Sequence, residues 1–411
     1  QTMLHVLKTE EVLQLIASLD LRETETETVS LEDALSRYLA EDITSPEDVP
    51  GFDRSTVDGY AVRASDTFGC SESIPALMPQ NGEVLMGEDA GAPLPAGAAR
   101  IIPTGGALPE GADAVVMKEY TEDYGDGTIG ILRPVSPGEN IIFRGDDVRA
   151  GHVVLPAGKR LSFLDIGALA AIGKTEIPVR RMPRIAILST GDELVPADRE
   201  PGAGQIRDVN SHMLQAFCRE WGAEPLCLGI FPDDENILGA ALDRAVKEAD
   251  LILLSGGSSV GTKDAACRLI EQKGTLLMHG IAMKPGKPTI LGLIVGKPVF
   301  GLPGHPAAAA FSARLFVSEV LCRLLGTSPR EYAVRAVLSE SLGANHGRTQ
   351  YTAVRLVSGP EGISAVPVRG KSGLITTLSS ADGYVCVPRE CEGFPAEDIV
   401  PVLKFTGMGV F

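Results

Sequence analysis

The chain has 411 residues, of which 44% are hydrophobic, and it carries a formal net charge of −17. This length predicts roughly two to four domains, because single hydrophobic cores stop growing well below it. The negative charge and an aromatic share of only 5% argue against nucleic acid or an anionic membrane as a partner. The seven cysteines are scattered without a C-x-x-C pair, and no signal peptide or membrane-spanning run is recognisable. We therefore expect a cytoplasmic protein with reduced thiols.

The first 45 residues show two helical patterns. Residues 9–19 begin with Thr9 and two glutamates, and residues 30–40 begin with Ser30 and an acidic pair one residue later. In both stretches the apolar residues then recur at helical spacing, which is typical of a capped amphipathic helix. Two helices are predicted here.

The composition changes abruptly after these helices. Residues 46–144 are rich in Gly and Pro and contain only short β-type runs, which indicates a small β domain. Longer elements return at 145–180, where residues 151–156 are typical of a strand and residues 165–172 of a short helix. We expect the β domain to be inserted into an elongated α+β domain made of residues 1–45 plus 145–180.

Residues 181–326 alternate between strand and helix patterns. Strands are expected at 184–189, 225–230, 251–254, 276–281, 289–294 and 299–302. Helices are expected at 211–221, 235–248, 264–273 and 306–325. This alternation predicts a mostly parallel sheet covered by helices on both faces, in which ligands bind beyond the carboxyl ends of the strands. Residues 327–411 show only alternating β runs and predict a C-terminal, barrel-like β domain. The fold class is multidomain α/β plus β.

Three loops of this α/β domain have a composition suited to ligands. They are Ser-Gly-Gly-Ser-Ser-Val-Gly at 255–261, Lys-Pro-Gly-Lys-Pro at 284–288 and Leu-Pro-Gly-His-Pro at 302–306. Glycines remove side chains where a ligand can meet bare backbone N–H groups, and serines add hydroxyl groups. The alternative is a set of ordinary turns in which Asp264 only caps the next helix. Three such loops in one domain favour a ligand site.

Charged residues of both signs follow the predicted strands. The acidic ones are Asp192, Glu193, Asp233, Asp234 and Asp264. The basic ones are Lys284, Lys287 and either Arg355 or Arg369. Carboxylates suit Mg²⁺ bound together with substrate phosphates, and the basic side chains suit phosphate or another oxyanion. The alternative is that the carboxylates cap helices and the lysines lie in solvated turns. For His305, a structural role at a helix start is favoured over catalysis.

Five stretches closely resemble the molybdopterin molybdenumtransferases, which are the bacterial MoeA proteins and the C-terminal domain of gephyrin. They lie at 50–61, 189–194, 255–264, 284–288 and 302–306, in the family's order across essentially the whole chain. The resemblance implies a central domain of the molybdopterin-binding type. It also implies an enzyme that inserts molybdate into adenylylated molybdopterin, hydrolyses the adenylate with a divalent cation, Mg²⁺, and releases AMP and molybdenum cofactor. A homodimer with sites shared between subunits is implied as well.

The resemblance also implies the site residues. Catalytic roles fall to Asp58, which would reach into the partner's site, and to Glu193, Asp233 and Asp264, which would hold Mg²⁺ and order the attacking water. The implied substrate-binding residues are Thr104, Ser255, Gly256, Gly257, Ser259, Lys284, Pro285, Gly286, Lys287, Pro303, Gly304, Arg355 and Ser372.

Two other functions are alternatives to this one. A molybdopterin adenylyltransferase has a similar α/β domain, but residues 1–180 and 330–411 would then have no purpose. A non-catalytic scaffold, a role that gephyrin relatives also have, does not explain the retained carboxylates. On the transferase interpretation, an upstream adenylyltransferase is an expected partner.

Overall fold

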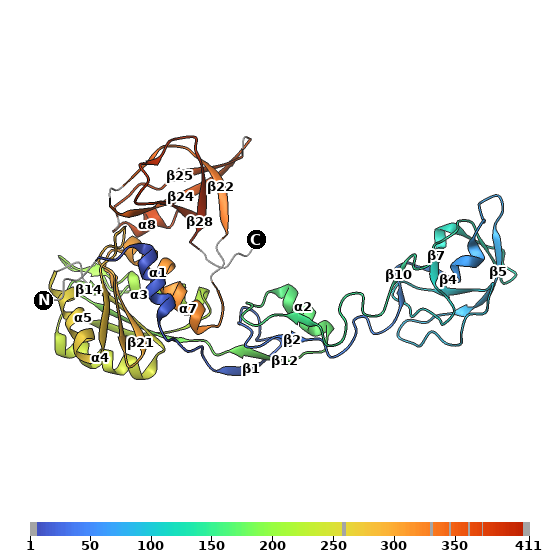
Figure 1. The fold of residues 1–411 in the computed structure, drawn as a ribbon, viewed down its shortest axis with the longest axis horizontal. Helices are drawn as coiled ribbons and strands as arrows, with labels where there is room; N and C mark the ends of the chain where they lie inside the picture. Colours follow the sequence, from blue (N-terminus) through green and yellow to red (C-terminus); the bar gives the residue numbers. More distant parts are fainter. Residues whose placement is uncertain are drawn as a thin grey trace.

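The computed structural model describes residues 6–256, 260–328, 332–344, 347–360, 362–371 and 373–405, with side chains from residue 265 onward in the segment that begins at 260. The molecule is elongated (Figure 1). An α/β unit and a C-terminal β unit lie at one end, an inserted β unit lies at the other, and a thin α+β connection joins them.

A six-stranded sheet forms the α/β unit. Its strand order is β16 (Glu224–Phe231), β13 (Arg184–Thr190), β17 (Leu251–Gly256), β21 (Lys297–Pro303), β20 (Ile290–Ile294) and β18 (Thr275–His279). The first four strands are parallel, and the last two are antiparallel to their neighbours. The prediction of a mostly parallel sheet is confirmed, and the four parallel strands end along one edge.

Helices cover both faces of this sheet because its central strands are apolar on both sides. Along β13, Ile185 and Ile187 belong to one core cluster, whereas Ala186 and Leu188 belong to another. The covering helices are α3 (Asn210–Glu220), α4 (Glu235–Glu248), α5 (Val260–Lys273), α6 (Pro306–Ser312) and α7 (Ser318–Leu324), the last two joined by a π-helical segment, Ala313–Val317. In the described part of the chain, no helix is long and apolar enough to cross a membrane.

The C-terminal unit is a closed barrel, as the sequence predicts. Its strands are β22 (Ala333–Leu338), β24 (Thr349–Gly359), β25 (Gly362–Pro367), β26 (Gly383–Val387) and β28 (Ile399–Lys404). The ring closes because β24 pairs with both β25 and β26. Smaller elements are β23 (Leu342–Gly343), β27 (Gly393–Phe394) and α8 (Ile375–Leu378). A short strand of the α/β unit, β19 (Met283–Lys284), pairs in parallel with β24 and joins the two units.

The rest of the chain forms the connection and the inserted unit. In the connection, β1 (Thr26–Ser30) pairs with β12 (Glu176–Arg180), and β2 (Ile43–Thr44) pairs with β11 (Val153–Leu155), beside α2 (Phe163–Ala171). The preceding α1 (Thr9–Ser18) packs on the α/β unit. The inserted sheet has the order β7 (Ala114–Met117), β4 (Gly59–Val62), β6 (Ala99–Ile102), β5 (Ala76–Glu83), β9 (Thr128–Ile131) and β8 (Thr121–Asp123). A short pair, β3 (Arg54–Ser55) and β10 (Ile141–Ile142), lies at its base.

The predicted helix at residues 30–40 is wrong. Ser30 ends β1, and the residues after it form turns in which the Asp33 N–H donates to the Ser30 hydroxyl. Leu39 bridges to Val179, and its N–H donates to the carbonyl of Lys159 at 3.0 Å. Ala34, Tyr38 and Leu39 are buried whereas Leu35 is 54% exposed, and contacts with distant segments override the local helical pattern.

Candidate active site

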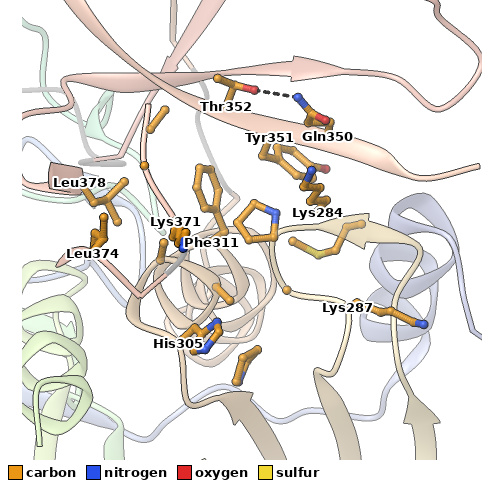
Figure 2. A pocket seen from close by; sticks show the side chains of 18 of the residues that line it. Lys284, Lys287, His305, Phe311, Gln350, Tyr351, Thr352, Lys371, Leu374 and Leu378 are labelled. Atoms are coloured by element: carbon orange, nitrogen blue, oxygen red, sulfur yellow. Dashed lines mark hydrogen bonds between the residues drawn. The ribbon is translucent and has the colours of Figure 1, made fainter. Parts of the chain in front are cut away.

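A cavity of about 750 Å³ lies between the α/β unit and the barrel (Figure 2). The residues that line it come from four stretches, 283–288, 303–311, 348–353 and 368–378. Six of the predicted site residues line it, namely Lys284, Pro285, Gly286, Lys287, Pro303 and Gly304. The cavity thus lies beside the carboxyl end of β21, where a ligand site is expected in such a sheet.

The charges that line this cavity are all positive. Among the residues that the structure describes, Lys284, Lys287, Arg348 and Lys371 line it together with His305, and no Asp or Glu does. None of the four cations forms an ion pair with another residue that the structure describes. In a chain with a net charge of −17, such a cluster creates a local positive potential that would attract an anion.

Carboxylates gather at the other end of the same sheet edge, after β13 and β16. The Asp233 carboxylate accepts a hydrogen bond from the Thr190 hydroxyl at 2.6 Å, and the Asp233 N–H donates to Asp192 Oδ1 at 3.2 Å. Glu193 lies in the turn that follows β13. Asp234, the residue after Asp233, has a structural role. Its side chain accepts hydrogen bonds from the first-turn N–H groups of α4 and caps that helix. The Asp233 carboxylate is therefore positioned by Thr190, whereas Asp234 is structural.

These carboxylates can contribute to a magnesium site. Within the described residues, no group of three or more His, Cys, Asp or Glu side chains could by itself hold a metal ion. Mg²⁺ normally takes only one or two carboxylates and completes its shell with water and substrate phosphates. Glu193 and Asp233 fit that pattern. Asp264 is the fifth residue of α5, after its first turn, and its side chain is outside the described part.

A buried asparagine that the sequence analysis missed ties two ligand loops together. The Asn210 side-chain amide donates to the Ser255 hydroxyl at 2.9 Å and to the Gly304 carbonyl at 3.0 Å. Ser255 is only 3% exposed, so this hydrogen bond is buried and fixes the end of β17 to the start of α3. The signal in the sequence is the polar stretch at 207–211, which runs into the first turn of α3.

Gly256 is required by close packing at the end of β17. A Cβ atom added there would lie 2.3 Å from the Thr190 Cγ2 atom. We expect Gly256→Ala to destabilise the α/β unit by about 1–3 kcal/mol and to displace Thr190 from Asp233. The unfolding midpoint, followed by fluorescence, tests this because the one tryptophan, Trp221, is buried in this unit.

The matched control for that substitution is Gly343→Ala in β23, where an added Cβ meets no atom within 4 Å. Its midpoint should equal that of the wild type. An unchanged midpoint for Gly256→Ala would show that Thr190 adapts without cost.

Asp58 and Thr104 lie elsewhere, on the inserted unit. The Thr104 N–H and hydroxyl donate to Asp58 Oδ1 at 2.7 and 2.9 Å. These two bonds hold the pKa of the Asp58 carboxyl below its usual value, which favours the anion. The inserted unit lies at the opposite end of the molecule from the α/β unit and the barrel (Figure 1), whose residues line the cavity, so one chain does not bring Asp58 and Thr104 to it.

The basic residues of the barrel differ from the predicted ones. Arg355 is exposed on β24 and does not line the cavity. Arg369 forms an ion pair with Glu340 at 2.6 Å. Arg348 and Lys371 line the cavity instead. Of the other predicted residues, Gly257, Ser259 and Ser372 lie outside the described part.

The fold and the cavity define a multidomain α/β protein with a cavity lined by cationic side chains at the carboxyl ends of its parallel strands. Three family models match successive parts of the chain. Residues 7–173 match the MoeA N-terminal region (domain I and II), residues 186–323 match a model described as "Probable molybdopterin binding domain", and residues 335–405 match the MoeA C-terminal region (domain IV).

Relatives match over nearly the full length. The chain is 36% identical to the molybdopterin molybdenumtransferase of Bacillus subtilis over 93% of this chain and 90% of that protein. It is 34% identical to molybdopterin molybdenumtransferase 2 of Mycobacterium tuberculosis over 93% and 94%. The crystal structure of the MoeA protein of Pyrococcus horikoshii OT3 matches with a TM-score of 0.87 at 34% identity, covering 97% of this chain and all of that one. The chain belongs to the MoeA family.

Proposed function

We propose that this protein is a molybdopterin molybdenumtransferase, an enzyme of molybdenum cofactor biosynthesis. It takes adenylylated molybdopterin and molybdate as substrates and releases AMP and molybdenum cofactor. The observation that carries this proposal is a cavity lined, among the described residues, by four cations and no carboxylate, in a MoeA-family chain. Phosphate and molybdate are both oxyanions, which such a cavity attracts. The family models on both sides of residues 186–323 disfavour a single-domain adenylyltransferase.

The lysines and the carboxylates, at the two ends of the carboxyl edge of the sheet, have different roles. Lys284 and Lys287 hold a phosphate or molybdate oxyanion in the cavity. Glu193, Asp233 and Asp264 would hold Mg²⁺, which neutralises charge on the substrate phosphates when it is bound. In the hydrolytic step, water supplies an oxygen to the adenylate phosphorus, the bond to the pterin phosphate breaks, and a carboxylate of this group accepts the proton.

The same proposal includes a homodimer. Asp58 and Thr104 are far from the cavity of their own chain, yet their arrangement presents an ionised carboxylate on an exposed surface. In a dimer, the inserted unit of one subunit supplies these two residues to the site of the other. The upstream adenylyltransferase would deliver the substrate. The four-domain division with bounds at 45, 144, 180 and 326 is part of this proposal, supported by one hydrophobic cluster within each of the four parts. A further cluster joins α1, the α/β unit and the barrel.

Molybdenum transfer itself tests the proposed function. The purified protein is incubated with adenylylated molybdopterin, molybdate and Mg²⁺, and the product is supplied to a molybdenum-free molybdoenzyme. We expect the molybdoenzyme to regain activity only when all components are present. Activation at the same rate without this protein would contradict the proposal.

A further inference from the structure

We propose that the loop at residues 85–92 of the inserted unit binds substrate in the site of the partner subunit, with Leu85 and Met86 packing against a fused nitrogen heteroaromatic ring. Adenylylated molybdopterin contains two such rings, the pterin and the adenine. The identity of the substrate and its place between two subunits rest on the proposed function. The rigid apolar surface itself rests on contacts within the inserted unit.

Met86 stands at the corner of a tight turn. The Glu88 N–H donates to the Leu85 carbonyl at 3.3 Å, and Gly87, the third residue of the turn, has a φ of +78°. This is the geometry of a type II turn, which favours glycine at the third position. Turn corners normally carry small or polar residues, whereas Leu85 and Met86 are 51% and 62% exposed here. Two large apolar side chains are therefore held in solvent at one point of the surface.

A buried arginine fixes the base of this loop. Arg100 is only 6% exposed. Its guanidinium donates to the backbone carbonyls of Asn81, Ala90 and Ala92 at distances between 2.7 and 2.8 Å, so it binds the chain on both sides of the turn. A buried guanidinium is costly unless its donors are paired, and this network therefore favours one shape of the loop. A preorganised loop loses less conformational entropy when it contacts a ligand.

The turn borders the segment that presents the Asp58 carboxylate. Gly105 directly follows Thr104, whose N–H and hydroxyl donate to Asp58. A Cβ atom added at Gly105 would lie 3.5 Å from the Met86 Cε atom, so the end of the Met86 side chain is adjacent to this segment. The apolar corner and the carboxylate thus belong to one surface of the inserted unit, and a substrate that reaches Asp58 also meets Met86.

The chemistry of the loop favours a ring over a phosphate group. Glu88 and Asp89 follow the corner and are exposed, and their negative charge repels an anion. The thioether of Met86 suits a flat aromatic ring, because sulfur–aromatic contacts are favourable. The pterin and the adenine also carry amino groups, which can donate hydrogen bonds to carboxylates. The alternative occupant is an apolar surface of the partner subunit.

Steady-state kinetics of AMP release tests the role of the loop. Met86→Gln keeps the length of the side chain but makes its end polar, and Met86→Leu keeps it apolar. We expect Met86→Gln to raise the KM for adenylylated molybdopterin about five- to tenfold and to leave kcat within about twofold, because a contact with an unreactive ring binds substrate and transition state alike. Met86→Leu should keep the KM within about twofold of the wild-type value.

Equilibrium titrations with AMP and with molybdopterin, each alone and without oxygen, identify the ring. Weaker binding of molybdopterin by Met86→Gln assigns the loop to the pterin. Weaker binding of AMP assigns it to the adenine. Unchanged binding of both ligands refutes the proposal.

The matched control is Leu77→Gln. Leu77 is also exposed, but it lies near the start of β5, whereas the loop follows the end of that strand, about 20 Å away. This variant should bind and turn over substrate within about twofold of the wild type, and a loss equal to that of Met86→Gln would refute the proposal. Light scattering measures the mass of each variant, and dissociation of Met86→Gln into monomers would place the loop against the partner's surface and refute a contact with substrate.

Purified heterodimers show which subunit's site the loop serves. In the first heterodimer, one chain carries Met86→Gln and the other carries Asp233→Ala, so the site with an intact Asp233 receives a wild-type loop. In the second, one chain carries both substitutions and its partner is wild type, so the site with an intact Asp233 receives the substituted loop. We expect a wild-type KM for the first and the raised KM for the second. The reverse result would place the loop in the site of its own chain and refute the contact between subunits.

Failure of the loop assignment differs from failure of the proposed function. A wild-type protein that releases no AMP from adenylylated molybdopterin refutes both. A wild-type protein that releases AMP, with a Met86→Gln variant of equal KM and equal affinity for both ligands, refutes the loop assignment alone.

Discussion

Asp233→Ala should lower the turnover number by about a hundredfold to ten-thousandfold while leaving the fold intact. Asp233 is exposed at the carboxyl end of β16, and its removal takes one acceptor from the buried Thr190 hydroxyl, so only a small loss of unfolding free energy, about 1 kcal/mol, is expected. Its carboxylate is aimed by the Thr190 hydroxyl at 2.6 Å, which indicates a group held for a ligand. Turnover is measured as AMP release at saturating substrate and Mg²⁺.

The adjacent residue provides the matched control. Asp234 accepts hydrogen bonds from the N–H groups of Asn236 and Ile237 at 2.9 and 3.0 Å and caps α4. Asp234→Ala should therefore lower the free energy of unfolding by about 1 kcal/mol and leave turnover nearly unchanged. If the two substitutions had exchanged effects, the assignment of the two carboxylates would be wrong.

Mixing two inactive variants should restore activity if the site is shared across a dimer. Asp58→Ala removes the carboxylate on the inserted unit, and Asp233→Ala removes the one on the α/β unit. In a heterodimer, one site carries both substitutions and the other carries neither. An equal mixture that exchanges subunits freely makes half of the dimers heterodimers, so about a quarter of wild-type turnover is expected.

Subunit exchange has to be demonstrated in the same experiment. Differently tagged subunits that purify together establish the heterodimer, and a mixture kept from exchanging is the control, with no recovery expected. A heterodimer as inactive as its parents would contradict a cross-subunit site and leave Asp58 with a role inside its own chain.

The α/β unit could be predicted because its signals are local. Buried runs such as 251–254 mark strands between capped helices, and α4 begins and ends at the predicted residues. The helix expected at 30–40 failed because the decisive contacts, such as that of Leu39 with Val179, span more than a hundred residues. Local periodicity does not contain that information.

The residues of the candidate site also divide into those that local sequence signals predict and those that only the fold brings together. Lys284 and Lys287 could be predicted because they follow a strand, where ligands bind in an α/β sheet. Arg348 could not, because its place depends on the pairing of β19 with β24 across two units. The cavity reaches only residues 348–353 of that strand, which leaves the predicted Arg355 outside it. Asn210 was missed since its partners, Ser255 and Gly304, are brought to it only by the fold.

AMP release from adenylylated molybdopterin, measured with Mg²⁺ in the presence and absence of molybdate, tests the central claim most directly. We predict that AMP forms in step with molybdenum bound to the pterin, that it depends on molybdate and that Asp233→Ala abolishes it. A folded protein that forms no AMP under any of these conditions would contradict the assignment of the cavity and its carboxylates to molybdenum insertion.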